Sequence, residues 1–580
     1  MSKQYGVLSF FTLWAAILWS GAIDTVQAQT PWQWRNLTPS NGAAPEARRN
    51  GAAIYDPIGK RLIIFGGVGV NGLLNDTWAF DLALRTWTKL TVQGTPPAPR
   101  LGFDAIYDPT GHQMVIYAGQ GAGFFNDTWS LDLNTLAWRD LSPPAATRPK
   151  ARYGSGSVFD PVSRSLVQFA GFTEESRRFQ DTQSFSLANN TWQDWTPAGA
   201  KPEIRCLLTA AFDRTNLRMI IYGGQRSGFL DDVWSFDLAA RTWTSLTPSQ
   251  RPPGRWFAAS FVDRAGRFNV FGGVTSNGNV NDVWSFDLSA RQWTKLSITN
   301  PPSERNGSLA AYLEVEDRLL VFGGNGNSGL LNDVWELRRA ETLTAVSAAS
   351  FVGNNVAPDS IVAAFGKNLG TSTQAATTTP LPTALADLRL RLKDSAGAER
   401  DAPLFFVSPT QINFLVPNNA AAGLATLTLA DAGGTVASST LNISNVAPSL
   451  FSADASGKGL AAAVVLRVRA NGAQTTEAIA RWEATQNRFV AVPIDLSAEN
   501  EQVYLILFGT GFRYRSGLSN VRVQLGGVET SVLYAGAQGD FAGLDQLNIA
   551  LPRNLAGRGE IQIALTVDGQ LANNLQLQIK

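Results

Sequence analysis

The 580-residue chain is poor in the side chains that most often carry chemistry, with one histidine, His112, and one cysteine, Cys206. A lone cysteine cannot form an intrachain disulfide, and the two residues are too few for a His/Cys metal cluster. A Ser-His-Asp or Cys-His site would have to use His112, which lies in the turn sequence DPTGHQM, so we expect an exposed turn residue. We expect Cys206 to be a small buried side chain.

An excess of charge of either sign is also absent, since 48 basic residues balance 47 acidic ones for a net charge of +1. This balance argues against a nucleic-acid partner or an anionic membrane surface bound through bulk charge. No glycine-rich stretch stands between a strand and a helix, as a phosphate-binding loop requires. A hydrolase that uses only carboxylates stays open, because pairs of Asp and Glu meet in space and not in sequence.

The first 28 residues have the pattern of an export signal. Lys3 precedes the apolar run VLSFFTLWAAILW, and VQA at 26–28 is a small-residue cleavage site. This run of thirteen residues, of which eleven are apolar, is short for a membrane span. We therefore predict cleavage after Ala28, no membrane span in the mature chain, and a secreted, periplasmic or cell-surface location. An exported chain without disulfides is typical of bacteria.

A short motif around an aspartate recurs six times in the first 340 residues. Its copies are NDTW, NDTW, QDTQ, DDVW, NDVW and NDVW, with the aspartates at Asp76, Asp127, Asp181, Asp232, Asp282 and Asp333, which are 50 to 54 residues apart. Each unit holds four short alternating segments, of which the second usually ends in an aromatic residue and two glycines, as in RLIIFGG. Such segments predict four antiparallel strands per unit.

The glycine pair after the second segment and the two tryptophans downstream resemble the Kelch family of β-propellers. The resemblance covers residues 31 to about 340 and implies one blade per unit. We therefore predict an all-β protein with a six-bladed propeller over residues 29–340.

The first segment of the predicted propeller is a fourth strand that closes no preceding unit. The stretch WQWRNLTP matches the fourth segments, whereas the sixth unit ends after NDVWELRRAE without one. We expect Trp34 and Leu37 to pair with the strand from Val334 to Leu337, completing the last blade. Such closure removes an open sheet edge.

A second repeat begins after residue 341. IVAAFGKNLG matches VYLILFGTGF, and QINFLVP matches QLNIALP. These alternating segments predict two β-sandwich modules, residues 341–446 and 447–580. Their openings resemble immunoglobulin-like domains of the IPT/TIG type. The stretches APLFFVSPTQINFLVP and VDGQLANNLQLQI resemble an uncharacterised C-terminal domain of large exported bacterial proteins, which implies placement and no chemistry.

An arginine stands 16 or 17 residues before the aromatic residue at the end of the second segment in each unit. The six are Arg48, Arg100, Arg152, Arg205, Arg255 and Arg305. The symmetry of a propeller would gather them around one mouth, together with the loop residues Asn71, Phe124, Phe125, Arg177, Arg178, Arg226 and Phe229. One hypothesis pairs the arginines with the motif aspartates as scaffold ion pairs. The other is a cationic, partly aromatic platform for an acidic ligand, because guanidinium groups bind carboxylates bidentately; arginines at this repeat position hold acidic peptide side chains in one Kelch adaptor.

We therefore expect an exported, non-enzymatic binding protein without a cofactor, whose ligand is a protein or a glycan and which binds no nucleic acid. The candidate ligand-binding residues are the six arginines with Tyr153 and Trp256, which follow Arg152 and Arg255. Two alternatives stay open: a sugar-modifying enzyme similar to the sialic-acid mutarotases among Kelch proteins, and a purely architectural surface protein. The copper oxidases related to Kelch propellers use two histidines, which excludes that activity here.

Overall fold

The computed structural model describes residues 32–174, 177–298 and 300–580, and the predicted signal segment, residues 1–28, lies outside them. The described chain forms two compact units, which meet in the sequence between Arg339 and Ala340. Within these ranges the chain has strands, turns and short 3-10 helices but no α-helix, which confirms the predicted all-β class. No helix there is long and apolar enough to cross a bilayer.

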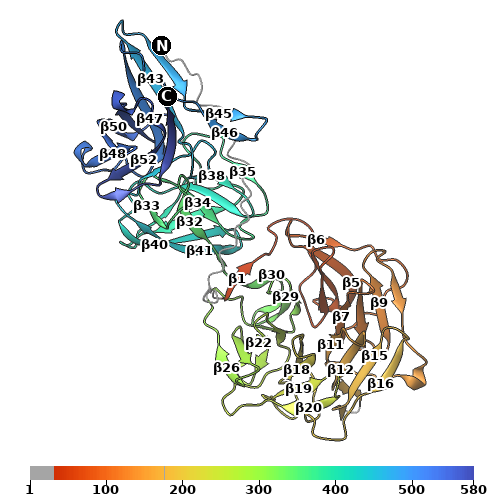
Figure 1. The fold of residues 1–580 in the computed structure, drawn as a ribbon. Helices are drawn as coiled ribbons and strands as arrows, with labels where there is room; N and C mark the ends of the chain where they lie inside the picture. Colours follow the sequence, from red (N-terminus) through yellow and green to blue (C-terminus); the bar gives the residue numbers. More distant parts are fainter. Residues whose placement is uncertain (1–31, 175–176, 299) are drawn as a thin grey trace. The chain divides into compact units, whose positions relative to one another are not determined.

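The described part of the first unit contains six antiparallel blades of four main strands each (Figure 1). In order from the inner to the outer strand, the blades are β3 (Ala52–Asp56), β4 (Arg61–Gly69), β5 (Gly72–Asp81), β6 (Thr86–Lys89); β7 (Asp104–Asp108), β8 (Gln113–Tyr117), β9 (Thr128–Asp132), β10 (Trp138–Asp140); β11 (Gly156–Asp160), β12 (Ser165–Phe169), β15 (Thr182–Ser186), β16 (Thr191–Asp194); β17 (Thr209–Asp213), β18 (Arg218–Tyr222), β19 (Val233–Asp237), β20 (Thr242–Ser245); β21 (Ala259–Val262), β22 (Arg267–Phe271), β25 (Val283–Asp287), β26 (Gln292–Lys295); and β28 (Leu309–Leu313), β29 (Arg318–Gly326), β30 (Gly329–Arg339), β1 (Trp32–Asn36).

Short strands extend several blades at the end where the second strand stops. They are β2 (Arg48–Arg49), β13 (Phe172–Thr173), β14 (Arg177–Arg178), β23 (Val274–Thr275), β24 (Gly278–Asn279) and β27 (Arg305–Asn306). We call this end of the propeller the mouth.

Burial changes from strand to strand in a way that explains the sequence pattern. The second strands are buried at nearly every residue, as in β18 with only Arg218 partly exposed, because neighbouring blades cover both of their faces. The fourth strands bury little more than their tryptophan, as in β20 around Trp243. The apolar run in the sequence thus corresponds to a strand buried on both faces, and the lone tryptophan to a strand that packs against its neighbour mainly through that residue.

Every seam between blades joins a fourth-strand tryptophan to the aromatic residue that ends the second strand of the preceding blade. The six contacts are Trp87–Phe322, Trp138–Phe65, Trp192–Tyr117, Trp243–Phe169, Trp293–Tyr222 and Trp34–Phe271, with ring centroids 4.4 to 5.2 Å apart. Aromatic pairs at such distances add about 0.5–1.5 kcal/mol each to the stability that burial provides. The repeated aromatic residue and the repeated tryptophan are therefore partners across blades.

A cycle of backbone hydrogen bonds links the blades at the start of the inner strands. In this cycle the N–H of one residue donates to the carbonyl of the next residue in the series, which belongs to a neighbouring blade. The series is Asn50, Gly307, Phe257, Leu207, Gly154, Gly102 and back to Asn50, with distances of 2.5 to 3.1 Å. All six residues have φ between 53° and 67°, a left-handed conformation that glycine adopts at little cost and other residues adopt rarely.

Strand β1 is the fourth strand of the last blade. It pairs antiparallel with β30, with Trp34 opposite Leu337 and Asn36 opposite Trp335, and the Leu37 N–H donates to the Val334 carbonyl at 2.8 Å. The pairing predicted for this segment is confirmed. Arg35 adds an ion pair to Glu336, 3.3 Å away, which is 1% exposed.

The second unit contains two β-sandwiches. The sheets of the first hold β31 (Glu341–Thr342), β33 (Asn355–Val356), β36 (Arg389–Lys393), β37 (Glu399–Asp401), β40 (Gly423–Asp431) and β41 (Gly434–Ile443), and β32 (Thr344–Ser347), β34 (Ile361–Phe365), β35 (Gln374–Ala375), β38 (Leu404–Val407) and β39 (Gln411–Leu415). Those of the second hold β42 (Ser449–Leu450), β43 (Ala463–Arg469), β44 (Gln474–Ala478), β47 (Glu501–Thr510), β50 (Val532–Ala537) and β51 (Asp545–Ala550), and β48 (Val521–Leu525), β49 (Val528–Thr530), β52 (Gly559–Val567), β53 (Gln570–Leu571) and β54 (Leu575–Ile579). A separate hairpin joins β45 (Ala480–Glu483) and β46 (Arg488–Ala491). The two repeated motifs are paired strands in each sandwich, β34 with β39 and β47 with β51.

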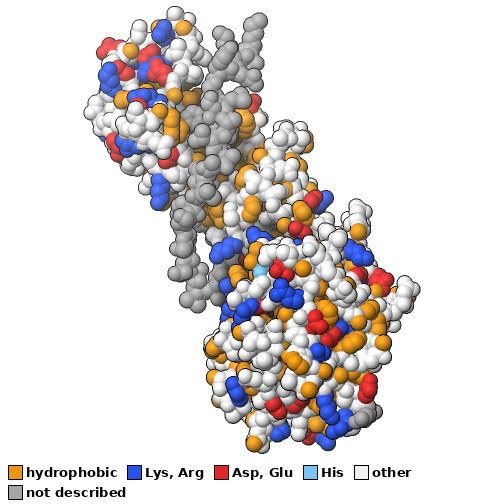
Figure 2. Space-filling model, turned by 90° about the vertical axis from the view of Figure 1, so that its right-hand side faces the viewer, with side chains coloured by type: hydrophobic (Ala, Val, Ile, Leu, Met, Phe, Trp, Pro, Cys, Tyr) orange, Lys and Arg blue, Asp and Glu red, His pale blue; other side chains and the backbone are white. Residues whose placement is uncertain are grey.

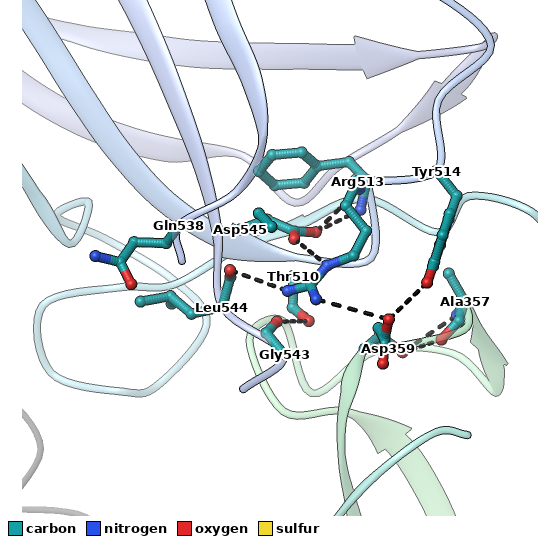
Figure 3. Close-up of polar contacts among 12 residues, drawn as sticks. Ala357, Asp359, Thr510, Arg513, Tyr514, Gln538, Gly543, Leu544 and Asp545 are labelled. Atoms are coloured by element: carbon teal, nitrogen blue, oxygen red, sulfur yellow. Dashed lines mark hydrogen bonds and ion pairs between the residues drawn. The ribbon is translucent and has the colours of Figure 1, made fainter. Parts of the chain in front are cut away.

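The two sandwiches meet through polar contacts (Figure 3) and through a buried apolar cluster to which both contribute. Arg513 donates from Nε to Asp545 Oδ1 at 2.7 Å, and its Nη1 lies 3.8 Å from Asp359. Tyr514 donates its hydroxyl to the same Asp359 at 2.6 Å, and the Thr510 hydroxyl accepts from the Ile361 N–H at 2.9 Å. Burial raises the pKa of Asp545, although the charge of Arg513 acts against this. The contacts fix the second sandwich on the first.

The prediction for His112 is wrong. The residue does occupy a turn, with φ of 45°, but it is only 9% exposed. Its Nε2 lies 2.9 Å from Asp56 Oδ1 of the first blade, and its Nδ1 lies 2.9 Å from Asn134 Oδ1. The imidazole is therefore part of the seam between the first two blades, a contact that a turn sequence does not reveal.

We predict that Trp34→Ala lowers the free energy of unfolding of the propeller by about 3–5 kcal/mol, because Trp34 is 4% exposed and packs on Phe271 across a seam. Urea unfolding followed by tryptophan fluorescence measures the loss. Ile58→Ala, at a turn residue 68% exposed, is the control and should change little. An equal effect of the two substitutions would contradict the role of β1.

Candidate binding site at the propeller mouth

Each of the six repeat arginines forms a two-pronged ion pair with the motif aspartate of its own blade. The pairs are Arg48–Asp76, Arg100–Asp127, Arg152–Asp181, Arg205–Asp232, Arg255–Asp282 and Arg305–Asp333, with the shortest nitrogen–oxygen distance 2.6 or 2.7 Å in each. All six arginines are at most 1% exposed. The hypothesis of scaffold ion pairs is the one that this geometry supports.

Further donors of these guanidinium groups bond to backbone carbonyls. In Arg205, Nε donates to the Glu203 carbonyl at 3.0 Å and Nη1 to the Gly223 carbonyl at 3.1 Å, in addition to both bonds to Asp232. Burial raises the pKa of Asp232, but the hydrogen bonds and charge of Arg205 outweigh it, so the pKa lies below its usual range. The carboxylate is thus held ionised.

The structure does not provide the cationic platform predicted from the six arginines. Their guanidinium groups have no accessible surface for an anion, and their charge is already matched by a carboxylate. Basic and acidic side chains are also interspersed over the face in Figure 2, as the overall charge balance implies. The six arginines therefore position the mouth and do not line it.

The motif aspartate has a second partner that explains the rest of the motif. Asp76 Oδ2 accepts a hydrogen bond from the Trp78 indole N–H at 2.7 Å, and the other NDTW, DDVW and NDVW copies do the same. In the divergent copy QDTQ, Gln183 replaces the tryptophan and its amide donates to Asp181 Oδ2 at 3.2 Å. The third unit thus keeps the hydrogen bond with another side chain.

The residue after each buried arginine lies at the mouth and differs from blade to blade. The six are Arg49, Leu101, Tyr153, Cys206, Trp256 and Asn306. Tyr153 forms an aromatic cluster with Phe172 and Phe124, at centroid distances of 5.7 and 5.8 Å, and Trp256 stacks on Phe229 at 4.1 Å. These side chains are partly exposed, so Tyr153 and Trp256 lie where the sequence predicted, among further aromatic residues.

Several further contacts at the mouth are polar. The Asn306 amide donates to Asn279 Oδ1 at 2.7 Å. Arg178 donates from Nη2 to Gln225 Oε1 at 3.2 Å. Cys206 lies beside this pair and is 1% exposed, and burial raises the pKa of its thiol although Arg178 acts against this. Cys206 is a buried side chain, as predicted.

A positional rule accounts for these contacts. Phe124, Arg178, Phe229 and Asn279 each stand three residues before a motif aspartate, and each contacts the next blade near the residue that follows its arginine. Sequence reasoning missed Phe172, Gln225, Asn279 and Asn306 as mouth residues. Counting back from the aspartate, as well as forward from the arginine, would have found two of them, Asn279 and Asn306.

The described residues offer no group of three or more His, Cys, Asp or Glu side chains placed to hold a metal ion. The mouth instead combines aromatic rings, amides and Arg178. Such a surface can pack against apolar groups and donate hydrogen bonds to a ligand.

We predict that Arg205→Ala destabilises the propeller by about 3–5 kcal/mol, because it leaves Asp232 largely buried and unpaired. Arg226→Ala is the matched control in the same blade; its pair with Glu203 is 49% and 59% exposed, so the loss should stay below about 1 kcal/mol. Urea unfolding followed by tryptophan fluorescence reports on this unit, since Trp482 is the one tryptophan of residues 29–580 outside it. Losses of similar size would refute the scaffold role.

Several known proteins match parts of the chain. The multiple epidermal growth factor-like domains protein 8 of Mus musculus is 28% identical over 245 residues, which are 39% of this chain and 9% of that protein. Kelch domain-containing protein 10 of Xenopus tropicalis is 27% identical over 37% of this chain and 53% of its own length. Adagio-like protein 3 of Oryza sativa subsp. japonica is 27% identical over 52% of this chain and 50% of its own length. The matched region thus spans about half or less of each of these relatives.

Among solved structures, a fungal alcohol oxidase of the AA5 family in complex with copper aligns with 72% of this chain and 100% of its own, at 11% identity and a TM-score of 0.38. That likeness is too low to bear on chemistry. The model of the KLHDC2/KLHL20/DRC7 Kelch-repeats domain matches three overlapping segments, residues 19–147, 140–265 and 246–365. Because these segments cover more than half of the chain, the protein belongs to this family of Kelch-repeat domains.

Proposed function

We propose that the protein is an exported interaction scaffold whose propeller binds a partner protein at the mouth without catalysis. The observation that carries this proposal is that the mouth combines a constant set of buried ion pairs with side chains that vary. Six buried ion pairs repeat the same geometry, while the side chain after each arginine changes from blade to blade. Four of these side chains are partly exposed, at Arg49, Leu101, Tyr153 and Trp256, whereas Cys206 and Asn306 are buried. A constant frame that presents different side chains in different blades is suited to recognition.

The frame favours binding by holding the mouth residues in place before a partner arrives. The mouth segments that follow the arginines are anchored by the ion pairs and by the cycle of backbone hydrogen bonds. Rigid side chains lose little conformational freedom on binding, which leaves more of the contact free energy for affinity. The aromatic cluster and the Trp256–Phe229 stack are of the residue types that most often dominate interfaces.

The sandwiches fit a role as spacer or attachment. Their resemblance to IPT/TIG-type domains and to a C-terminal domain of exported bacterial proteins supports this assignment. Contacts that cross between the sandwiches support a stiff spacer. Tyr514 donates to Asp359, the Ile361 N–H donates to Thr510, and both sandwiches contribute to one apolar cluster, which together resist bending between the modules.

The export part of the proposal has its own test. We expect the mature protein to begin at Gln29, because the signal pattern ends in VQA at residues 26–28. N-terminal sequencing of protein recovered from outside the cytoplasm of the producing cell checks it. Recovery of chains that still begin at Met1 would count against export with cleavage.

We predict that Trp256→Ala and Phe124→Ala each weaken binding of a partner protein by about thirtyfold or more, the loss of a typical aromatic hot spot of about 2 kcal/mol. Thermal unfolding should change little by comparison, because both side chains are partly exposed. Peptide and glycan arrays probed with the full mature chain supply ligands, and surface plasmon resonance measures affinity. Trp482→Ala, in the second sandwich and 48% exposed, is the matched control. Unchanged affinity in both mouth variants would place binding elsewhere.

A further inference from the structure

A polar groove lies at one end of the second sandwich. It has a volume of about 570 Å³ and is lined by Ser516, Asn520, Arg522, Thr566, Asp568 and Gly569. Two of these residues are cross-strand neighbours, since Arg522 of β48 lies opposite Thr566 of β52. None of the lining residues has an apolar side chain, so hydrogen bonds and charge, rather than apolar packing, would hold a ligand here.

Hydrogen bonds hold one wall of the groove in place. Asp568 accepts from the Ser516 backbone N–H at 2.8 Å and from the Ser516 hydroxyl at 2.6 Å. Asn520 donates from Nδ2 to the Ser516 hydroxyl oxygen at 2.7 Å, and the Asn520 carbonyl accepts from the Asp568 N–H at 3.0 Å. These bonds join the loop before β48 to the turn after β52. A ligand would therefore meet a wall that is already ordered, which reduces the entropic cost of binding.

Arg522 supplies the positive charge of the groove, and its side chain is exposed. Within the described ranges it forms no ion pair or hydrogen bond through its guanidinium, whereas Arg467 and Arg513 of the same sandwich each pair with a carboxylate. Asp568, the carboxylate of the groove, already accepts two hydrogen bonds from Ser516. The planar fork of Arg522 is thus available, and such a fork binds a carboxylate through two hydrogen bonds at once.

The sheet face beside the groove presents amide groups. Four glutamines lie on the solvent side of β48, β52 and β54, where the alternate residues are buried: Gln524, Gln562, Gln576 and Gln578. Gln524 lies on the same face as Arg522, about 7 Å along the strand. The carboxylate of Glu560 stands at the far end of this face, about 20 Å along β52 from Thr566. Amides both donate and accept hydrogen bonds, as sugar hydroxyls do.

We propose that the groove binds an acidic sugar of an oligosaccharide, with Arg522 on its carboxylate and the four glutamines along the neighbouring sugars. The lining favours a saccharide over a peptide, because its hydroxyls and amides match sugar hydroxyls and it offers no apolar surface to hydrophobic side chains. This inference goes beyond the function proposed for the propeller, since the site lies wholly in the second sandwich. Binding of an acidic glycan here would provide the attachment role of the sandwiches.

The test uses the full mature chain with short oligogalacturonates, whose sugars carry carboxylates, and with neutral galactose oligomers of the same length. Isothermal titration calorimetry measures both affinities. We expect the acidic series to bind about tenfold more tightly, the lower end for a hydrogen bond to a charged group, because the groove is open to water. Arg522→Gln should abolish this preference, and Arg522→Lys should keep part of it, because lysine lacks the planar fork. Thr566→Val should weaken binding of both series about two- to tenfold.

Arg558→Gln is the matched control. Arg558 is exposed, precedes β52 at the end opposite to Thr566, and also has no carboxylate partner among the described residues. Its replacement removes the same charge from the same sandwich and should leave the preference intact. Thermal unfolding of Arg522→Gln should match that of the unsubstituted protein, because the side chain is exposed.

Trp256→Ala separates this site from the mouth of the propeller, because it should leave the binding of oligogalacturonates unchanged. Equal affinity for the two series, no binding by either, equally tight binding of acidic peptides, or an unchanged preference in Arg522→Gln would each overturn the proposal. Loss of the preference in Trp256→Ala would also overturn it and would place the saccharide at the mouth. Failure of the groove in any of these ways leaves the proposed function of the mouth to its own test.

Discussion

The propeller depends on one ion pair repeated in every blade. Each guanidinium links the segment just before the first strand of its blade to the aspartate at the third strand. The same arginine also donates to a backbone carbonyl in the turn that follows the second strand. A buried arginine without a carboxylate would be costly, and so would a half-buried aspartate without a cation. The pair therefore fixes the geometry of the turn, and the turn sets where the variable residues of the mouth stand.

Much of the fold could be predicted because the repeats place equivalent residues in register. The spacing of the aspartates predicted the blades, and the isolated WQWRNLTP segment predicted the pairing of β1 with β30. His112 shows where this reasoning ended, because its partner Asp56 lies 56 residues earlier and in another blade. A turn motif specifies the local backbone, but the neighbour across a seam decides whether its side chain is buried.

The candidate site could be predicted only in part. Tyr153 and Trp256 follow directly from the repeat register, whereas the role of the arginines depended on whether each one reached a carboxylate. The charges of Arg152 and Asp181 lie 29 residues apart in the chain, and only the folded blade shows that they meet at 2.7 Å. Phe172 and Gln225 were missed because loop residues gain their neighbours from the next blade and carry no periodic signal.

The pairing of β1 with β30 has a consequence for the order in which the chain becomes complete during synthesis. Arg35 and its partner Glu336 are 301 residues apart. At a translation rate of about 5–20 residues per second, β1 waits roughly 15–60 seconds for the strand that covers it. Through that interval Trp32 and Trp34 lack the partners that bury them in the finished ring. The first strand of the propeller to be made is thus among the last to be protected, and a factor that shields nascent chains would find its target at the N-terminal end.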